Sequence, residues 1–195
     1  MADLKFMYGT MGSGKSGRII DTAYSLRASG KRVEALKPAF DNRDSNTDIV
    51  SRSRNTRLPA TVLQNLNGYK PKADTQFILV DEVQFFSPSD IQTLVRIANS
   101  TPIVVMCYGL LLDSDQVMFP ASAALIQSGA ELEEMRTCCQ INGCLNHATH
   151  HLRFDGAGNV VRRGAQCQVG DSAYKSVCRQ HFYNMYHGIG KGRMK

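Results

Sequence analysis

Residues 4–16, LKFMYGTMGSGKS, join a short apolar segment to a glycine-rich loop. Residues 9–16 match the pattern G-x-x-x-x-G-K-S, the spacing with which a loop wraps its backbone N–H groups around phosphate oxygens. Apolar residues at helical spacing follow over 17–28, and a further apolar segment, RVEALKP, covers 32–38. We therefore predict a strand, the loop, a helix and a second strand, which together open a parallel sheet.

The glycine-rich loop has the residues needed to hold a nucleoside triphosphate. Lys15 can reach the β- and γ-phosphates, and the Ser16 hydroxyl can ligate Mg²⁺. Residues 77–82, FILVDE, supply the acidic partner, because an apolar strand that ends in an acid places a carboxylate at the carboxyl edge of a parallel sheet. Asp81 is expected to hold Mg²⁺ through water, which leaves Glu82 to act on the attacking nucleophile.

Further along the chain, apolar periodicity predicts two more helices and one more buried strand. A helix is predicted over 88–98 with Ser87 as its N-cap, a strand over 101–109 and a helix over 121–130. Residues 41–61 are polar and weakly periodic and are expected to form an irregular excursion. These elements predict an α/β fold, with a P-loop NTPase-type parallel sheet flanked by helices.

From about Cys138 the composition changes, and cysteine and histidine replace the long apolar segments. Two pairs, Cys139-x₄-Cys144 and Cys178-x₂-His181, have a spacing typical of the ligands of a structural Zn²⁺. The adjacent Cys138 is the alternative to Cys139. Such a metal would stabilise a subdomain that is too small to have a sufficient core of its own.

A domain boundary is expected near residues 134–137, where this change in composition begins. We predict a P-loop nucleotide-binding domain over 1–136, a zinc-binding subdomain over 137–187, and a basic tail over 188–195. The fold class is then α/β with a small C-terminal zinc-binding subdomain.

Composition limits what else the chain can be. With 195 residues, 43% of them hydrophobic, and 23 Lys and Arg against 17 Asp and Glu, it is a globular mixture with a net charge of +6. It contains no apolar run of about 18–20 residues and no signal-peptide pattern at its start, so we expect a cytoplasmic protein with no membrane partner. The arginines of residues 52–57 and the basic tail are either solvated or steer a phosphate-bearing ligand.

Several motifs together resemble the type II thymidine kinases, the cytosolic and tetrameric class. They are GTMGSGKS at 9–16, KPAFDNR at 37–43, DEVQFF at 81–86, CYGLLLD at 107–113, MRTCCQINGC at 135–144, ATHHLRF at 148–154 and YKSVCRQHF at 174–182. They follow the family's order along nearly the whole chain. The resemblance implies transfer of the γ-phosphate of ATP to the 5′-hydroxyl of thymidine, with deoxyuridine as a secondary acceptor, to give dTMP in nucleotide salvage.

The resemblance also implies roles for individual residues, with Glu82 as the proton acceptor of the D-E-x-Q motif. The implied ATP-binding residues are Gly9, Thr10, Met11, Gly12, Ser13, Gly14, Lys15, Ser16, Asp81, Glu82, Val83 and Gln84. The implied thymidine-binding residues are Asp41, Arg43, Phe119 and, from the lasso loop over 164–174, Val169, Gly170 and Tyr174. The implied zinc ligands are Cys139, Cys144, Cys178 and His181, and the implied assembly is a homotetramer.

The chain departs from the family at Ser114, where an aromatic residue is usual, and in the lasso sequence over 166–171. Both departures bear on which base is accepted.

One alternative function is a P-loop ATPase that binds nucleic acid, but the chain has no basic stripe interleaved with aromatic residues. The other, a nucleotide-binding regulator without turnover, is disfavoured by Glu82. ATP and thymidine, and no nucleic acid, are the expected partners.

Overall fold

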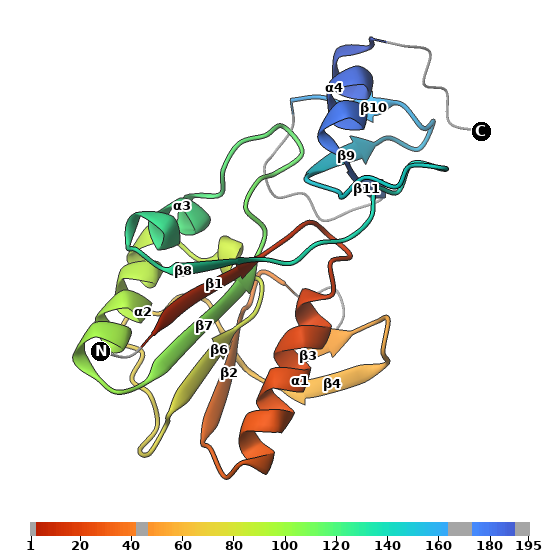
Figure 1. Ribbon diagram of the computed structural model, residues 1–195. Coiled ribbons are helices and arrows are strands. Elements are labelled where there is room, and N and C mark those ends of the chain that lie inside the picture. The colour runs from red at the N-terminus through yellow and green to blue at the C-terminus, as the bar shows by residue number, and fades with distance from the viewer. Residues whose placement is uncertain (1–2, 42–46, 164–172, 190–195) are drawn as a thin grey trace. The chain divides into compact units, whose positions relative to one another are not determined.

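The computed structural model describes residues 3–41, 47–163 and 173–189 (Figure 1). The chain divides into two compact units. The first comprises Met1–Tyr8, Gly14–Leu110 and Phe119–Glu134, and the second comprises Gly9–Ser13, Leu111–Met118 and Met135–Lys195. The first part of the glycine-rich loop therefore belongs to the same unit as the C-terminal part of the chain.

The first unit is built on a six-stranded sheet in which every neighbouring pair is parallel, in the order β5-β2-β6-β7-β1-β8. The strands are β1 (Leu4–Tyr8), β2 (Val33–Pro38), β5 (Thr61–Leu63), β6 (Phe77–Val80), β7 (Val104–Gly109) and β8 (Glu131–Glu134). In the middle of the sheet Leu36, Leu79 and Val105 are all 0% exposed, as strands covered on both faces require. The predicted α/β fold is confirmed.

Helices cover both faces of this sheet (Figure 1). α1 (Lys15–Ala28) lies on one face and buries Ile19 and Ile20. α2 (Pro88–Ser100) and α3 (Pro120–Gln127) lie side by side on the other face. Within the described ranges, no helix combines the length and the apolar character that crossing a membrane requires.

The start of α2 and the end of α3 each have a local cause. The Ser87 side chain accepts from the Asp90 N–H, and the Asp90 carboxylate accepts from the Ser87 N–H, so the predicted N-cap is confirmed as a reciprocal capping box. α3 ends at Gln127, before the predicted limit of residue 130, because Gly129 adopts a φ of +75° that ends the helix.

The segment 41–61, expected to be irregular, contains a hairpin instead. β3 (Asp48–Ser51) and β4 (Thr56–Pro59) pair antiparallel, with Ile49 opposite Leu58. These two side chains are 1% and 0% exposed, and the hairpin packs on α1. Each strand is too short for alternation to reveal it, but the buried pair makes the hairpin part of the core.

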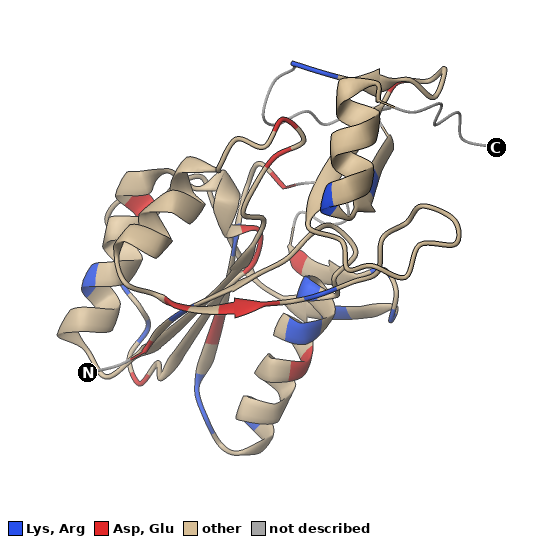
Figure 2. Ribbon diagram, turned by 45° about the horizontal axis from the view of Figure 1, so that its top comes forward, with Lys and Arg blue, Asp and Glu red and all other residues tan. Residues whose placement is uncertain are grey.

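Strand β8 lies at one edge of the sheet and was not predicted. It pairs with β1 through the backbone, and all four of its side chains are exposed. Figure 2 shows its glutamates in red. Because neither face of β8 is buried, its sequence carries none of the apolar pattern on which strand prediction relies.

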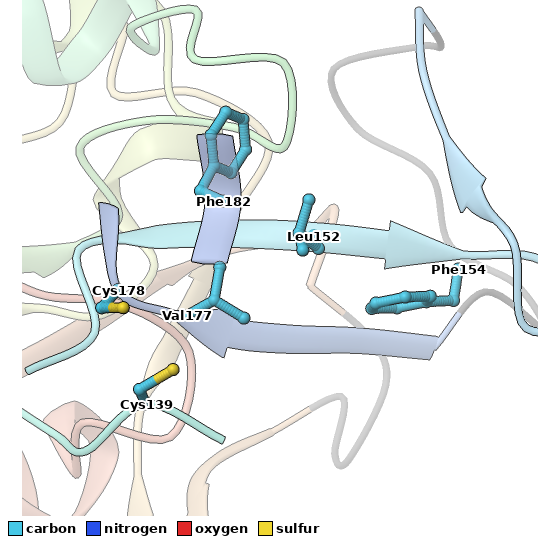
Figure 3. Packing of buried hydrophobic residues seen from close by; sticks show 6 residues of the cluster. All are labelled: Cys139, Leu152, Phe154, Val177, Cys178 and Phe182. Atoms are coloured by element: carbon cyan, nitrogen blue, oxygen red, sulfur yellow. The ribbon is translucent and has the colours of Figure 1, made fainter. Parts of the chain in front are cut away.

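In its described residues, the second unit contains a three-stranded antiparallel sheet, with the order β10-β9-β11, and a helix. The elements are β9 (His150–Phe154), β10 (Val160–Val161), β11 (Ala173–Val177) and α4 (Arg179–His187). Figure 3 shows its small apolar cluster, formed by Cys139, Leu152, Phe154, Val177, Cys178 and Phe182. Two of these six are predicted metal ligands, so the cluster and the metal site are contiguous.

The hairpin of β3 and β4 gives a testable prediction. Leu58→Ala should lower the free energy of unfolding by about 2–5 kcal/mol, because the substitution leaves a cavity in the core. Arg57→Ala is the matched control: this neighbouring side chain is 60% exposed, and its loss should cost less than about 0.5 kcal/mol. Denaturant unfolding followed by circular dichroism measures both. Equally small effects of the two substitutions would contradict a packed hairpin.

Candidate active site

The carboxyl end of β6 holds a buried carboxylate. Asp81 follows β6, and its N–H donates to the carbonyl oxygen of Leu36 on the neighbouring β2 at 2.9 Å. Asp81 is 5% exposed, and Lys15, at the start of α1, is 8% exposed. Burial, reinforced by the negative charge of Glu82, raises the pKa of the Asp81 carboxyl to about 7, while Lys15 acts in the opposite direction. A bound cation would therefore stabilise the ionised form of this carboxylate.

The Glu82 carboxylate is oriented by a glutamine. The Leu110 N–H, just after β7, donates to Oε1 of Gln84 at 3.0 Å. Because a backbone N–H can only donate, Gln84 must turn its amide oxygen toward Leu110 and its NH₂ group toward Glu82. That NH₂ group donates to the Glu82 carboxylate. Gln84 is 3% exposed, so this link between the ends of β6 and β7 is buried.

Two backbone features make this link possible. Glu82 has a φ of +48°, a left-handed conformation that is uncommon and costs about 1–2 kcal/mol in a residue with a side chain. Gly109 leaves space for Gln84, since a Cβ atom at Gly109 would lie 2.5 Å from Gln84 Oε1. The left-handed backbone at Glu82 and the lack of a side chain at Gly109 therefore both help to position the Glu82 carboxylate.

The glycine-rich loop has two backbone conformations that favour glycine. Gly12 and Gly14 have φ values of +76° and +83°. The Ser13 N–H donates to the Thr10 carbonyl oxygen at 3.2 Å, which closes a turn in the loop. Gly14 is the N-cap of α1, so the last two residues of the loop, Lys15 and Ser16, already form the first turn of the helix. The start of a helix in this arrangement attracts phosphate oxygens.

Sequence reasoning missed Lys37, which lies near the end of β2. Its side chain is 3% exposed, and its ammonium lies 3.3 Å from the Asp41 carboxylate. It also donates to the Asp48 carbonyl oxygen at 3.3 Å. A buried ammonium requires such partners. Lys37 therefore contacts both Asp41 and the first residue of β3, Asp48. The signal that could have revealed it is a lysine inside an otherwise buried strand.

The residues predicted to bind thymidine are only partly described. Phe119 is 3% exposed, and its ring centroid lies 6.3 Å from that of Phe85, which in turn lies 5.0 Å from that of Phe40. In the first unit, the Phe85 ring therefore packs against the rings of both Phe40 and Phe119. Tyr174 lies on β11 in the second unit and is half-buried. Arg43, Val169 and Gly170 lie outside the described residues.

The four predicted metal ligands come together in the second unit. One ligand atom from each of Cys139, Cys144, Cys178 and His181 lies within 4.8 Å of the others. The Sγ atoms of Cys144 and Cys178 are 3.9 Å apart, and Nδ1 of His181 is 3.4 Å from the Sγ atoms of both Cys139 and Cys178. Tetrahedral coordination with Zn–S bonds of about 2.3 Å would place two sulfurs about 3.8 Å apart. The cluster can therefore hold a metal such as zinc.

The neighbouring Cys138 is not part of this cluster. Its side chain is exposed, and its backbone forms an isolated bridge with His147. Within the cluster, burial opposes ionisation of Cys178, but hydrogen bonds from the His181 N–H and the Asn146 side chain outweigh it and lower the pKa of that thiol to about 7. A thiol that ionises readily suits a metal ligand.

Comparisons with known proteins identify the family of the chain. The family model described as "Thymidine kinase" matches residues 2–182. The thymidine kinase of Rhizobium meliloti is 37% identical over 93% of this chain and 96% of its own length, and that of Chromobacterium violaceum is 36% identical over 94% and 100%. The thymidine kinase of Streptococcus thermophilus is 35% identical over 94% and 95%. The family predicted from the motifs is confirmed, and the chain belongs to the thymidine kinase family.

Proposed function

We propose that the chain transfers the γ-phosphate of ATP to the 5′-hydroxyl of thymidine, giving dTMP and ADP. Its membership of the thymidine kinase family supports this activity. The observation that carries the proposal is the Glu82 carboxylate, which Gln84 orients directly after the buried Asp81. We also propose deoxyuridine as a secondary acceptor and a role in nucleotide salvage.

ATP is proposed to lie on the glycine-rich loop, residues 9–16, with Mg²⁺ beside it. The Asp81 carboxylate and the Ser16 hydroxyl are oxygen donors of the kind that Mg²⁺ prefers. Burial and the charge of Glu82 raise the pKa of the Asp81 carboxyl to about 7, and a divalent cation would hold that carboxyl ionised. Asp81, through water, and the Ser16 hydroxyl would hold the ion. When bound, Mg²⁺ would neutralise charge on the β- and γ-phosphate oxygens.

The proposed transfer needs few groups of the protein. O5′ of thymidine forms a bond to the γ-phosphorus, the bond from that phosphorus to the β–γ bridging oxygen breaks, and ADP leaves. Glu82 accepts the proton of the 5′-hydroxyl. Gln84 keeps the Glu82 carboxylate in one orientation, because the Leu110 N–H fixes its amide group. Lys15 stabilises negative charge on the transferred group.

The acceptor side of the site is proposed from the family resemblance. Phe119 and Tyr174 would enclose the base, and the other contacts would come from Asp41, Arg43, Val169 and Gly170. Asp41 is held by the buried Lys37. We further propose the domain division at residues 136 and 187, and a cytoplasmic homotetramer without nucleic-acid or membrane partners. Light scattering after gel filtration measures the assembly.

A coupled ADP-release assay across thymidine, deoxyuridine and deoxycytidine tests the proposed function directly. Turnover should be fastest with thymidine, slower with deoxyuridine and near background with deoxycytidine. ADP release that does not depend on any nucleoside would indicate an ATPase and would refute the kinase proposal.

Glu82→Gln should lower kcat by about 10²–10⁴-fold, because the amide cannot accept the proton of the 5′-hydroxyl. Binding of ATP and thymidine should change little, since the substitution preserves the size of the side chain. Glu133→Gln, on the exposed strand β8, is the matched control and should keep the wild-type rate. Steady-state kinetics with a nucleotide-binding measurement separates the two effects. A Glu82→Gln variant with wild-type kcat would exclude Glu82 as the proton acceptor.

Metal analysis of the purified protein should find about one zinc per chain, as expected for a closed four-ligand site. Cys178→Ser should lose the zinc and lower the melting temperature, because Cys178 is both a ligand and part of the apolar cluster. Cys138→Ser, which changes an exposed neighbour of the cluster, should retain the zinc. Active protein without zinc, or loss of zinc in Cys138→Ser, would contradict the assignment.

A further inference from the structure

Met11, the third residue of the glycine-rich loop, is held by the sheet of the second unit. Its N–H donates to Nε2 of His151 at 2.8 Å, and its carbonyl oxygen accepts from the Ser176 hydroxyl at 2.6 Å. His151 is 4% exposed and Ser176 is 1% exposed, so water does not compete freely for these bonds. Both backbone polar groups of Met11 are thus bound by buried side chains.

The two side chains act from one face of the sheet. His151 on β9 and Ser176 on β11 are directly opposite each other in the antiparallel register. Their sequence neighbours Leu152 and Val177 belong to the apolar cluster on the other face, which Figure 3 shows. Because side chains alternate along a strand, the cluster fixes the sheet from one side while His151 and Ser176 bind Met11 from the other.

The hydrogen bond also determines the state of His151. A backbone N–H can only donate, so Nε2 must be the unprotonated nitrogen of the ring. With the N–H and the carbonyl of Met11 both bound, the backbone enters Gly12, at a φ of +76°, in one orientation. The direction in which the following N–H groups point depends on that orientation.

We propose that His151 and Ser176 are positioning residues for ATP, which hold the glycine-rich loop in its phosphate-binding conformation through Met11. This rests on the proposed function only in that the loop binds ATP. Both residues would act on the nucleotide through the Met11 backbone. Ser176 is itself fixed, because its N–H donates to Gln140 Oε1 at 2.7 Å and its carbonyl accepts from the Gln140 N–H at 2.8 Å. Gln140 follows Cys139, so the loop is connected to the metal cluster through two residues.

The test compares three single variants in the full-length protein. His151→Phe keeps a ring but removes the acceptor, and should raise both the Kd and the KM for ATP by about 3- to 10-fold, the scale of a lost hydrogen bond. The kcat and the KM for thymidine should stay within about twofold of wild type. His151→Gln retains an acceptor at a similar reach and should restore most of the affinity. His150→Phe is the matched control, because His150 stacks on Phe182 at the opposite face and should leave ATP binding unchanged.

Equilibrium binding of a non-hydrolysable ATP analogue supplies the Kd, independently of turnover. A wild type that binds the analogue but does not phosphorylate thymidine would refute the proposed kinase activity and leave this test intact. His151→Phe with wild-type affinity, or His150→Phe with an equal loss, would overturn the positioning role. If His151→Phe does not fold, Ser176→Ala replaces it, since it removes the other bond to Met11 with a smaller change. Wild-type affinity in folded Ser176→Ala would then overturn the proposal.

Discussion

Parallel pairing of β1, β7 and β6 is the constraint on which the active site depends. Because these strands run in one direction, they all end at the same edge of the sheet. The residues that follow them are the glycine-rich loop, Leu110 and Asp81. Gln84 reaches both the Glu82 carboxylate and the Leu110 N–H because β6 and β7 are neighbours. A different strand order would separate the groups that the proposed chemistry needs together.

The parts of the fold that the sequence predicted are those with strong local signals. The segment FILV of β6 is apolar throughout because it is covered on both faces. The start of α2 is marked by its N-cap Ser87 and by Pro88 and Asp90 in its first turn. The cysteine and histidine pairs of the metal cluster could also be predicted, because the two members of each pair are closely spaced in the sequence. The elements that were not predicted have a short or solvent-exposed pattern. They are the hairpin of β3 and β4, the edge strands β5 and β8, and the three short strands and the helix α4 of the second unit.

Most of the contacts that orient the site residues could not be predicted, because they join distant parts of the chain. Gln84 meets Leu110, and Met11 meets His151 and Ser176. None of these pairs has a characteristic spacing, and each depends on strands brought together by the fold. Motifs therefore located the reacting groups and Gln84, whereas the contacts that orient these groups were visible only in the structure.

The acidic strand β8 has a consequence for how copies of the protein meet. An edge strand offers unpaired N–H and carbonyl groups to any other strand, which is a common route to aggregation. Here three glutamates and no buried side chain line that edge. Two such edges side by side would bring like charges together, and Leu132, 47% exposed, is the one apolar side chain of β8 whose burial could offset the repulsion. The charge of this edge thus disfavours growth of the sheet into a continuous ribbon across molecules.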